Sequence, residues 1–527
     1  MIKFNQYLSI FDILGPIMTG PSSSHTAGAV RIGLIARHIA GEVVSRAVIT
    51  FYGSLSKTYK GHFTDSGVVA GLIGMDVDDP SIRDALERAE KSGVFVRVDQ
   101  LLSKDKNPNT IELEIESGDG RIHRIESVTV GGGEILISSV DGFPVELRGK
   151  HDEILVFWDS GSDVPKELRS FFPDEETVSV QGPGGARLLV IRPVKLPGKQ
   201  LLKAIGDIEG VTCVRFLPRL YDYGKGDGPA LFKTVEEMVF YCSSRGVALP
   251  SAAEDYESGR SGLDRKVLRE KLTQTWAVMD DSARKGMSGK NLMVGGLMPG
   301  DDGRKLFDAF KKGITLSGSV LPMAIARAIS AMEVNASMGR VCAAPTAGSC
   351  GVIPGVLSAV MEGRRLKLDK ILDGLLVAGL YGALIASRAP VSGALGGCQS
   401  EIGVASAMAA AALTQIGGGN AEDTAHAMAL ALKSLMGLIC DPVAGPVEIP
   451  CIKRNAVGVA NAFSSADMAL AGIRSVIPPD EVIDALRNVQ LLMPVELRGT
   501  MMGGLGITET AKRLKAEWFA KCGSCKG

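Results

Sequence analysis

The residues of this sequence best suited to chemistry are three cysteines in loops rich in glycine and proline. Cys398 lies in Gly-Gly-Cys-Gln-Ser-Glu, whereas Cys440 and Cys451 bracket a loop that contains three prolines. Glycine lets the backbone approach a ligand closely and proline excludes regular helix, so we predict irregular loops that point the three thiols at one place. Thiolates from separate loops suit an iron-sulfur cluster in which one iron carries no protein thiolate.

Three other roles are open to these cysteines. They could be small buried apolar side chains, although these three do not lie on apolar helical faces in the predicted pattern. A disulfide between Cys440 and Cys451 is disfavoured, because nine cysteines, an odd number, and an N-terminal segment unlike a secretory signal indicate a reducing compartment. Structural zinc normally needs close Cys-x2-4-Cys pairs, which this stretch lacks.

A second group of reactive side chains is a run of hydroxyls and an imidazole after Gly20-Pro21. An apolar helical pattern begins directly after this run, near Ala29. One hydroxyl would be enough to cap that helix. Four hydroxyls and an imidazole at the positive end of a helix instead predict a pocket for a carboxylate. The residues are Ser22, Ser23, Ser24, His25 and Thr26.

The candidate general bases are His25 and His62. His62 follows a predicted strand at 48–52 and precedes another apolar helical pattern, so its position is like that of His25. Both imidazoles can titrate near neutral pH, and the sequence does not choose between them. Pyridoxal phosphate is not expected, because no lysine is paired with a glycine-rich phosphate-binding loop.

Five motifs in one order resemble the iron-sulfur-dependent L-serine dehydratases. They are Gly-Pro-Ser-Ser-Ser-His-Thr-Ala-Gly, Ala-Pro-Thr-Ala-Gly-Ser-Cys-Gly, Gly-Gly-Cys-Gln-Ser-Glu, Ile-Cys-Asp-Pro-Val and Ile-Pro-Cys-Ile-Lys-Arg-Asn. The resemblance implies a chain that fuses the family's beta-like and alpha-like parts. It implies that Cys398, Cys440 and Cys451 hold a [4Fe-4S] cluster whose open iron acts as a Lewis acid on the hydroxyl of L-serine. The implied products are pyruvate and ammonia.

Several points about the chemistry stay open at this level. In some relatives a cysteine at the chain end resembles a displaceable fourth ligand, and here Cys522 and Cys525 compete for that role. Loss of sulfide from L-cysteine, or of water from L-threonine, would use similar machinery. A non-catalytic amino-acid sensor and a zinc hydrolase on the same thiols are alternatives of other classes.

These residues are distributed over a predicted multidomain fold. Residues 1–148 carry strand and helix patterns typical of an α/β (α+β) domain. Residues 149–222 show the order β-α-β-β-α-β of a ferredoxin-like unit, which resembles the ACT regulatory domains of some serine dehydratases. A linker at 223–230 leads to residues 231–527, a large all-α domain that carries the three cysteines.

Composition limits the partners and the compartment. The 527 residues have a formal net charge of −1 and no basic stripe, so no nucleic-acid surface is expected. The apolar segment 371–389 contains Asp373 and Arg388 and is predicted to be a buried helix instead of a membrane span. We expect a cytoplasmic homo-oligomer, with a dimer as the simplest form, that takes L-serine as its substrate.

Overall fold

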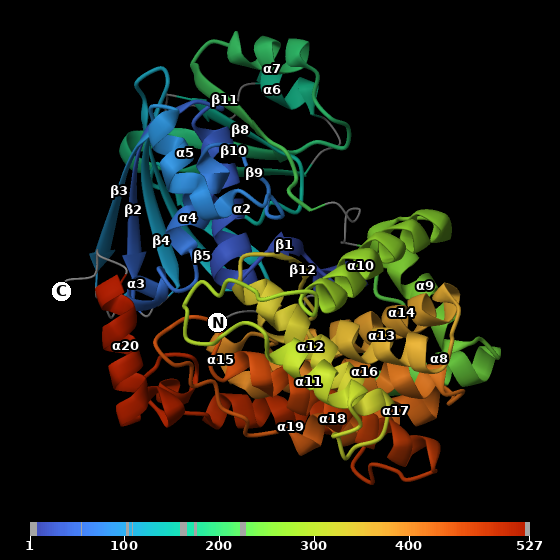
Figure 1. Ribbon diagram of the computed structural model, residues 1–527. Helices are drawn as coiled ribbons and strands as arrows, with labels where there is room; N and C mark the ends of the chain where they lie inside the picture. Colours follow the sequence, from blue (N-terminus) through green and yellow to red (C-terminus); the bar gives the residue numbers. More distant parts are fainter. Residues whose placement is uncertain are drawn as a thin grey trace. The chain divides into compact units, whose positions relative to one another are not determined.

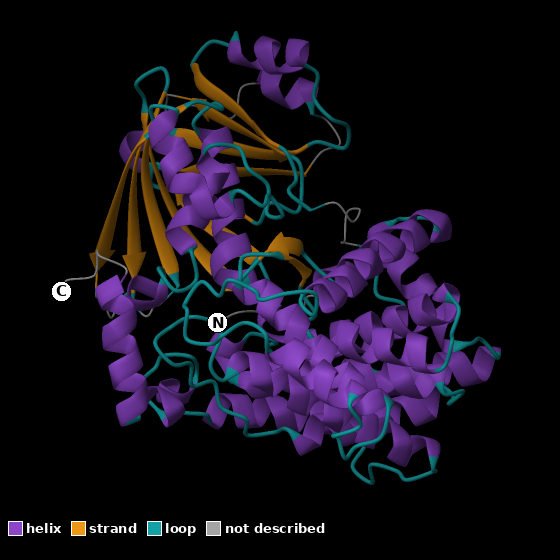
Figure 2. Cartoon of the chain, viewed as in Figure 1, coloured by secondary structure: helices purple, strands orange, loops and turns teal. Residues whose placement is uncertain are grey.

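The computed structural model describes residues 8–53, 55–101, 105–107, 109–158, 166–172, 176–221 and 228–521. The chain divides into two compact units: the helical unit, residues 1–24 and 223–527, and the sheet unit, residues 25–222. Strands gather in the sheet unit and most helices in the helical unit (Figures 1 and 2). The predicted mixed N-terminal part and largely helical C-terminal part are therefore confirmed.

The larger sheet of the sheet unit has six strands in the order β3-β2-β4-β5-β6-β7. Only the edge pair β2 and β3 is parallel, and the other pairs are antiparallel. The strands are β2 Val44–Tyr52, β3 Phe95–Leu101, β4 Thr110–Ser117, β5 Ile122–Gly131, β6 Glu134–Val140 and β7 Phe143–Leu147. Buried and less buried residues alternate along β4 and β5, so one face of the sheet belongs to the core.

Two helices of the sheet unit, α2 Gly28–Ile39 and α4 Thr64–Leu72, pack against each other at very short range. A Cβ atom on Gly33 would lie 2.1 Å from the carbonyl oxygen of Val68, and one on Gly71 equally close to that of Val30. Only glycine permits this approach. Two shorter helices, α3 Leu55–Thr58 and α5 Ala85–Lys91, belong to the same part of the chain.

The second sheet has four antiparallel strands in the order β11-β8-β10-β9. Its elements follow the predicted order and are β8 Glu153–Trp158, α6 Lys166–Phe171, β9 Glu176–Gln181, β10 Arg187–Arg192, α7 Lys199–Gly206 and β11 Val211–Leu217. Ile154, Val156 and Trp158 of β8 form a core with Leu168 of α6 and Ile205 of α7. The helices therefore cover one face of this sheet.

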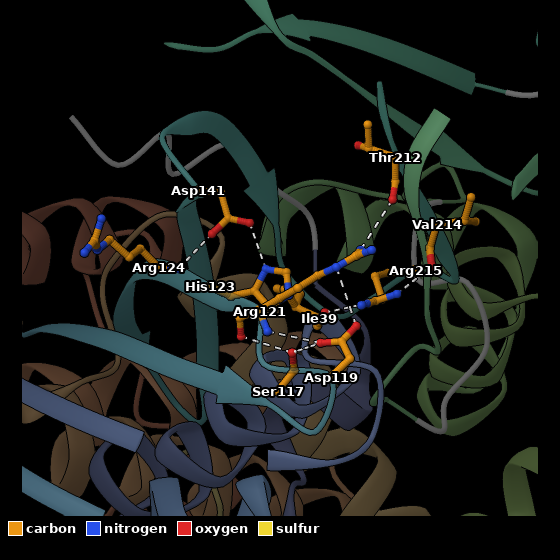
Figure 3. Close-up of polar contacts among 10 residues, drawn as sticks. All are labelled: Ile39, Ser117, Asp119, Arg121, His123, Arg124, Asp141, Thr212, Val214 and Arg215. Carbon is orange, nitrogen blue, oxygen red and sulfur yellow. Dashed lines mark hydrogen bonds and ion pairs between the residues drawn. The ribbon is translucent and has the colours of Figure 1, made fainter. Parts of the chain in front are cut away.

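A polar joint connects the two sheets within the sheet unit (Figure 3). The turn between β4 and β5 carries Arg121, whose guanidinium donates to the carbonyl oxygen of Thr212 on β11 at 3.4 Å. Arg215, also on β11, donates from Nε to the carbonyl oxygen of Ile39, the last residue of α2, at 2.7 Å. Strand β11 is thereby tied to the C-terminal end of α2.

The helical unit packs long helices rich in alanine, leucine and methionine. Helix α14 covers the segment 371–389 only to Ala386 and is buried along most of its length, as predicted. Among the described residues, no helix is both long and apolar enough to cross a membrane. A short antiparallel pair, β1 Ile17–Thr19 with β12 Arg340–Cys342, joins the N-terminal segment to the unit.

The helices of this unit are α1 Ile10–Ile13, α8 Val235–Arg245, α9 Leu249–Ser261, α10 Arg265–Lys285, α11 Asp302–Lys311, α12 Val320–Ala336, α13 Val352–Gly363, α14 Leu368–Ala386, α15 Gly393–Gly396, α16 Val404–Ile416, α17 Ala421–Ser434, α18 Cys451–Leu470, α19 Pro479–Leu492 and α20 Glu509–Lys521. Helix α18 begins at Cys451 itself, so the expectation that this cysteine lies in a loop is wrong. Pro450 precedes the first turn of α18, a position where proline is compatible with a helix start.

Candidate active site

The three candidate cysteines belong to different elements of the helical unit. Cys398 directly precedes a π-helical turn, Gln399–Gly403, which continues into α16. Cys440 lies in the segment between α17 and α18, where its N–H donates to the carbonyl oxygen of Leu497 and its carbonyl oxygen accepts from the N–H of Gly499. Cys451 is the first residue of α18. Three different local structures therefore hold the three thiols.

Two of these thiols and one carboxylate converge. The Sγ atoms of Cys398 and Cys440 and a carboxylate oxygen of Glu401 all lie within 4.8 Å of one another. The Sγ atom of Cys451 is outside this group, but its thiol is close enough to interact electrostatically with Cys398 and Cys440. Cys440 and Cys451 are both free thiols. Thiol and carboxylate donors at this range could hold a metal.

Burial sets the protonation of these groups. A hydrogen bond with Cys398, together with burial, holds the pKa of the Cys440 thiol well above its usual range. Burial also raises the pKa of Cys451. The positive group beside them is Arg454 on α18, whose Nη1 lies 3.5 Å from the Sγ of Cys398 and whose Nη2 pairs with Asp441 at 2.8 Å. A half-buried cation next to the thiols favours negatively charged ligands at this site.

Glu401 is held between the cysteines and the loop 344–351. The hydroxyl of Thr346 donates to Oε1 of Glu401 at 2.7 Å, and burial raises the pKa of this carboxyl. A Cβ atom on Gly393 would lie 2.4 Å from Oε2, so a larger residue there would displace this carboxylate oxygen. Glu401 follows Cys398 by three residues, a spacing that puts both side chains on one side of a helical turn. This spacing indicates a carboxylate beside the thiol, but the sequence analysis did not include Glu401 among the site residues.

The serine run reaches the same loop. Ser23 is buried, and its Oγ accepts a hydrogen bond from the N–H of Ala347 at 3.3 Å. The side-chain amide of Asn335 on α12 donates to the carbonyl oxygens of Pro21 and Ala347. Ser22 and Ser24 are half-buried. Within the helical unit, contacts therefore run from the serine run through the loop 344–351 to Glu401 and the thiols.

Asn455 on α18 fastens the other side of the loop 344–351. Its side-chain amide donates to the carbonyl oxygen of Gly348 at 3.0 Å, and its Oδ1 accepts from the N–H of Gly351 at 3.2 Å. Cys342 and Cys350, which flank the loop, are buried thiols, and burial raises the pKa of Cys342 to about 12. Both thiols are therefore packed in the interior beside the loop.

The two candidate bases lie together in the sheet unit. Nδ1 of His25 is 3.0 Å from Nδ1 of His62, and the two rings are stacked with centroids 4.8 Å apart. The hydroxyl of Thr26 donates to the carbonyl oxygen of His62 at 2.7 Å. His25 and Thr26 belong to a π-helical turn, Ser23–Ala27, that leads into α2. The two histidines, which were predicted to occupy similar positions before a helix, are therefore direct partners in the structure.

Both imidazoles are neutral at physiological pH. Burial lowers the pKa of His25 to about 4. Burial, and then the charge of His25, lower the pKa of His62 to about 3. In a contact between two neutral Nδ1 atoms one ring must donate and the other accept. The pair therefore offers neutral nitrogen bases instead of imidazolium cations.

Buried thiols and a carboxylate within reach of one metal, beside a hydroxyl-bearing loop, are typical of a metal-dependent enzyme. Comparison with known proteins identifies the kind of enzyme. The family model "Serine dehydratase alpha chain" matches residues 199–506, and "Serine dehydratase beta chain" matches residues 9–139. The chain belongs to the serine dehydratase family, whose members are lyases, and it combines both chains of the family in one. The family predicted from the motifs is confirmed.

Curated relatives agree with this assignment. The chain is 42% identical over 289 residues to the probable L-serine dehydratase alpha chain of Bacillus subtilis, which covers 55% of this chain and 96% of the relative. It is 31% identical over 523 residues to L-serine dehydratase TdcG of Escherichia coli, which covers 95% of this chain and 99% of the relative. L-serine dehydratase 2 of Escherichia coli is 29% identical over 520 residues, with 95% and 98% covered.

Proposed function

We propose that this protein is an L-serine dehydratase that converts L-serine to pyruvate and ammonia, with a [4Fe-4S] cluster held by Cys398, Cys440 and Cys451. The observation that carries the proposal is the convergence of Cys398, Cys440 and Glu401 next to a loop that also contacts the serine run. One buried and two half-buried thiols with a neighbouring arginine fit a cluster of net negative charge. Relatives named L-serine dehydratase along nearly the whole chain support the substrate.

When bound, a cluster with one iron free of protein thiolate supplies a Lewis acid that polarises the substrate hydroxyl. The chain's own groups bind and orient the amino acid. We assign the substrate carboxylate to the hydroxyls of Ser22, Ser23, Ser24 and Thr26 together with His25, because hydroxyl and N–H donors before a helix attract an anion. Such placement fixes the Cα–H and the hydroxyl in the relative orientation that elimination needs.

The α-proton is assigned to the His25–His62 pair. A neutral imidazole accepts the proton on a ring nitrogen, and the neighbouring ring can share the resulting charge through the Nδ1 contact. We leave open which of the two rings makes the first contact, because burial lowers the pKa of both. The hydroxyl then leaves as water by taking up the α-proton from the imidazole, and the resulting aminoacrylate tautomerises to an imine that water hydrolyses to pyruvate and ammonia.

The remaining parts of the chain have proposed roles too. We propose residues 1–148 as a beta-like domain, 149–222 as an ACT-like regulatory domain that senses an amino acid, 223–230 as a linker and 231–527 as the catalytic domain. The strand order β11-β8-β10-β9 with helices on one face supports the ACT-like assignment. The possible fourth ligands Cys522 and Cys525 lie outside the described residues. A cytoplasmic location is proposed from the cysteine usage.

The test is the visible absorption spectrum of anaerobically purified protein, with iron and sulfide analysis. We expect broad sulfur-to-iron charge-transfer absorption that bleaches in air and is lost in Cys440→Ala. The matched control is Cys213→Ala, which removes a half-buried thiol of β11 and should keep the absorption. One zinc per chain without iron or sulfide would contradict the proposal and favour a hydrolase.

Turnover assays on the same anaerobic preparation test the reaction. We expect pyruvate from L-serine at a higher kcat/KM than products from L-threonine or L-cysteine. Faster sulfide release from L-cysteine would show that L-cysteine is the preferred substrate and would leave the proposed cluster unaffected. Binding of L-serine without pyruvate formation, in protein with its cluster intact, would refute the lyase and favour a sensor.

A further inference from the structure

The outer edge of the six-stranded sheet is formed by β3, Phe95–Leu101 (Figure 1). Its inner edge pairs with β2, and among the described residues no strand pairs with its outer edge. Phe95 and Leu101, near its two ends, are 59% and 51% exposed. An exposed edge strand with apolar side chains is a template for pairing with another chain. We infer that β3 pairs antiparallel with β3 of a second copy of this chain, about a two-fold axis at Val98.

The backbone geometry permits this axis. The carbonyl oxygen of Leu101 accepts from the N–H of Gly53, so the backbone groups of Leu101 point toward β2. Because these groups alternate in direction along a strand, those of Val96, Val98 and Gln100 point to the outer edge. An axis at Val98 places Val98 opposite itself and Val96 opposite Gln100 of the partner subunit. Outward groups then meet outward groups, and about six backbone hydrogen bonds can form.

The side chains are complementary about the same axis. Arg97 faces Asp99 of the partner subunit, and Asp99 faces the partner subunit's Arg97. Within one chain these two residues already form an ion pair at 2.8 Å, so both charged groups lie on the same face of the sheet. Phe95 faces Leu101 of the partner subunit at each end of the ladder. Opposite charges and apolar pairs placed directly across two strands stabilise their pairing.

Neighbouring registers lack this complementarity. An axis at Arg97 would place two arginines opposite each other, and an axis at Asp99 would place two aspartates there. An axis between residues would bring outward backbone groups against inward ones and move side chains to opposite faces. Charged residues on an edge strand usually prevent pairing with other chains. Here Arg97 and Asp99 are complementary in one register with a second copy of the same strand. The partner of β3 is therefore a second copy of this chain.

The test is the molar mass of the full chain, purified anaerobically with its metal content measured, by light scattering across a concentration series. Wild-type protein should reach twice the 55.4 kDa of one chain. Arg97→Asp and Asp99→Arg should each raise the dimer dissociation constant at least about tenfold, because each places like charges opposite one another. The double variant Arg97→Asp/Asp99→Arg restores opposite charges and should return the constant to within about threefold of wild type.

Two further variants separate this pairing from general surface effects. Val98→Pro removes an outward N–H without touching the β2–β3 pairing, and should also give monomers. Arg124→Asp reverses a charge on the same face, on β5 away from the edge, and should leave the dimer intact. Circular dichroism of each variant checks folding. A wild-type monomer, single reversals that stay dimeric, or a folded double variant that stays monomeric would each overturn the pairing. None of these results bears on whether the chain dehydrates L-serine.

Discussion

Lowering the pH from about 7.5 to about 5 should destabilise the sheet unit, because the His25–His62 pair stays neutral in the folded chain at both pH values. The pKa is about 4 for His25 and about 3 for His62, against an ordinary value of 6.5. Between those values and 6.5, each histidine binds a proton in the unfolded chain but not in the folded one. The stability that the folded state gains from keeping this pair neutral is therefore fully present above pH 6.5. It is lost as the pH falls toward the pKa values of the two histidines in the folded chain.

The size of the effect follows from the width of that window. One pH unit corresponds to about 1.4 kcal/mol for each proton that only the unfolded chain binds. At pH 5, about 1.5 units below 6.5, each histidine would cost about 2 kcal/mol and the pair about 4 kcal/mol. His62 is partly exposed, and solvent screening reduces its share. We therefore expect a loss of about 2–4 kcal/mol in the free energy of unfolding.

Urea unfolding of the sheet unit at each pH measures this loss. The chain has three tryptophans, and Trp158 alone lies in the sheet unit, so a Trp276→Phe/Trp518→Phe background reports on that unit by fluorescence. Carboxylates also titrate in this range, so the decisive quantity is the difference between His62→Asn and its parent. The variant should lose about half as much stability between the two pH values.

A matched control identifies the pair as the cause. His38→Asn removes an imidazole on α2 that hydrogen-bonds Glu42 at the surface, and should not reduce the pH dependence as His62→Asn does. If His62→Asn and its parent lost equal stability to within about 0.5 kcal/mol, the neutral pair would not exist in solution.

Three other substitutions test single contacts. Glu448→Gln should lower the unfolding free energy of the helical unit by about 1–3 kcal/mol in urea titrations, because the buried carboxylate accepts three N–H bonds from the loop 295–298 and an amide cannot replace them all. Glu401→Gln should lower the iron content after anaerobic reconstitution, because an amide is a weaker metal ligand than a carboxylate. Arg215→Met should speed amide exchange at the C-terminal end of α2 by about five- to tenfold, because it removes the bond to the carbonyl of Ile39, worth about 1 kcal/mol.

The secondary structure of some segments can be predicted because it is determined by residues within the segment. The apolar run 187–192 predicts a strand and forms β10, Arg187–Arg192, whereas the run 211–216 predicts a strand and forms β11, which ends one residue later at Leu217. Both are short apolar runs between glycine or proline residues, and a run of that length is decided by local propensity. The same holds for α10, because Asp264 at the start of the amphipathic segment 264–285 is a typical N-cap residue and caps the helix in the structure.

Helix α9 shows why other elements were missed. Its buried face mixes Glu254, Glu257 and Arg260 with apolar residues such as Ala253 and Tyr256, so the segment 249–261 gives no clear periodicity. Glu257 is buried because it accepts hydrogen bonds from the hydroxyl of Ser9 and the N–H of Ile10, nearly 250 residues away. A charged residue that is buried against distant partners looks like a surface residue in the sequence.

The candidate site also has features that the local sequence predicts and features that depend on distant residues. Glycine and proline marked the loops around Cys398 and Cys440 because these residues restrict the backbone locally, but the carboxylate that meets the thiols is oriented by Thr346, 55 residues away from Glu401. What the two motifs share is a helix start: π-helical turns at Ser23–Ala27 and at Gln399–Gly403 precede α2 and α16. A π-helical turn accommodates one more residue than an α-helical turn and so rotates the side chains before it relative to the helix that follows. No residue type is characteristic of such a turn. The residue types therefore locate the reactive groups in the sequence, but only the folded structure shows in which directions their side chains point.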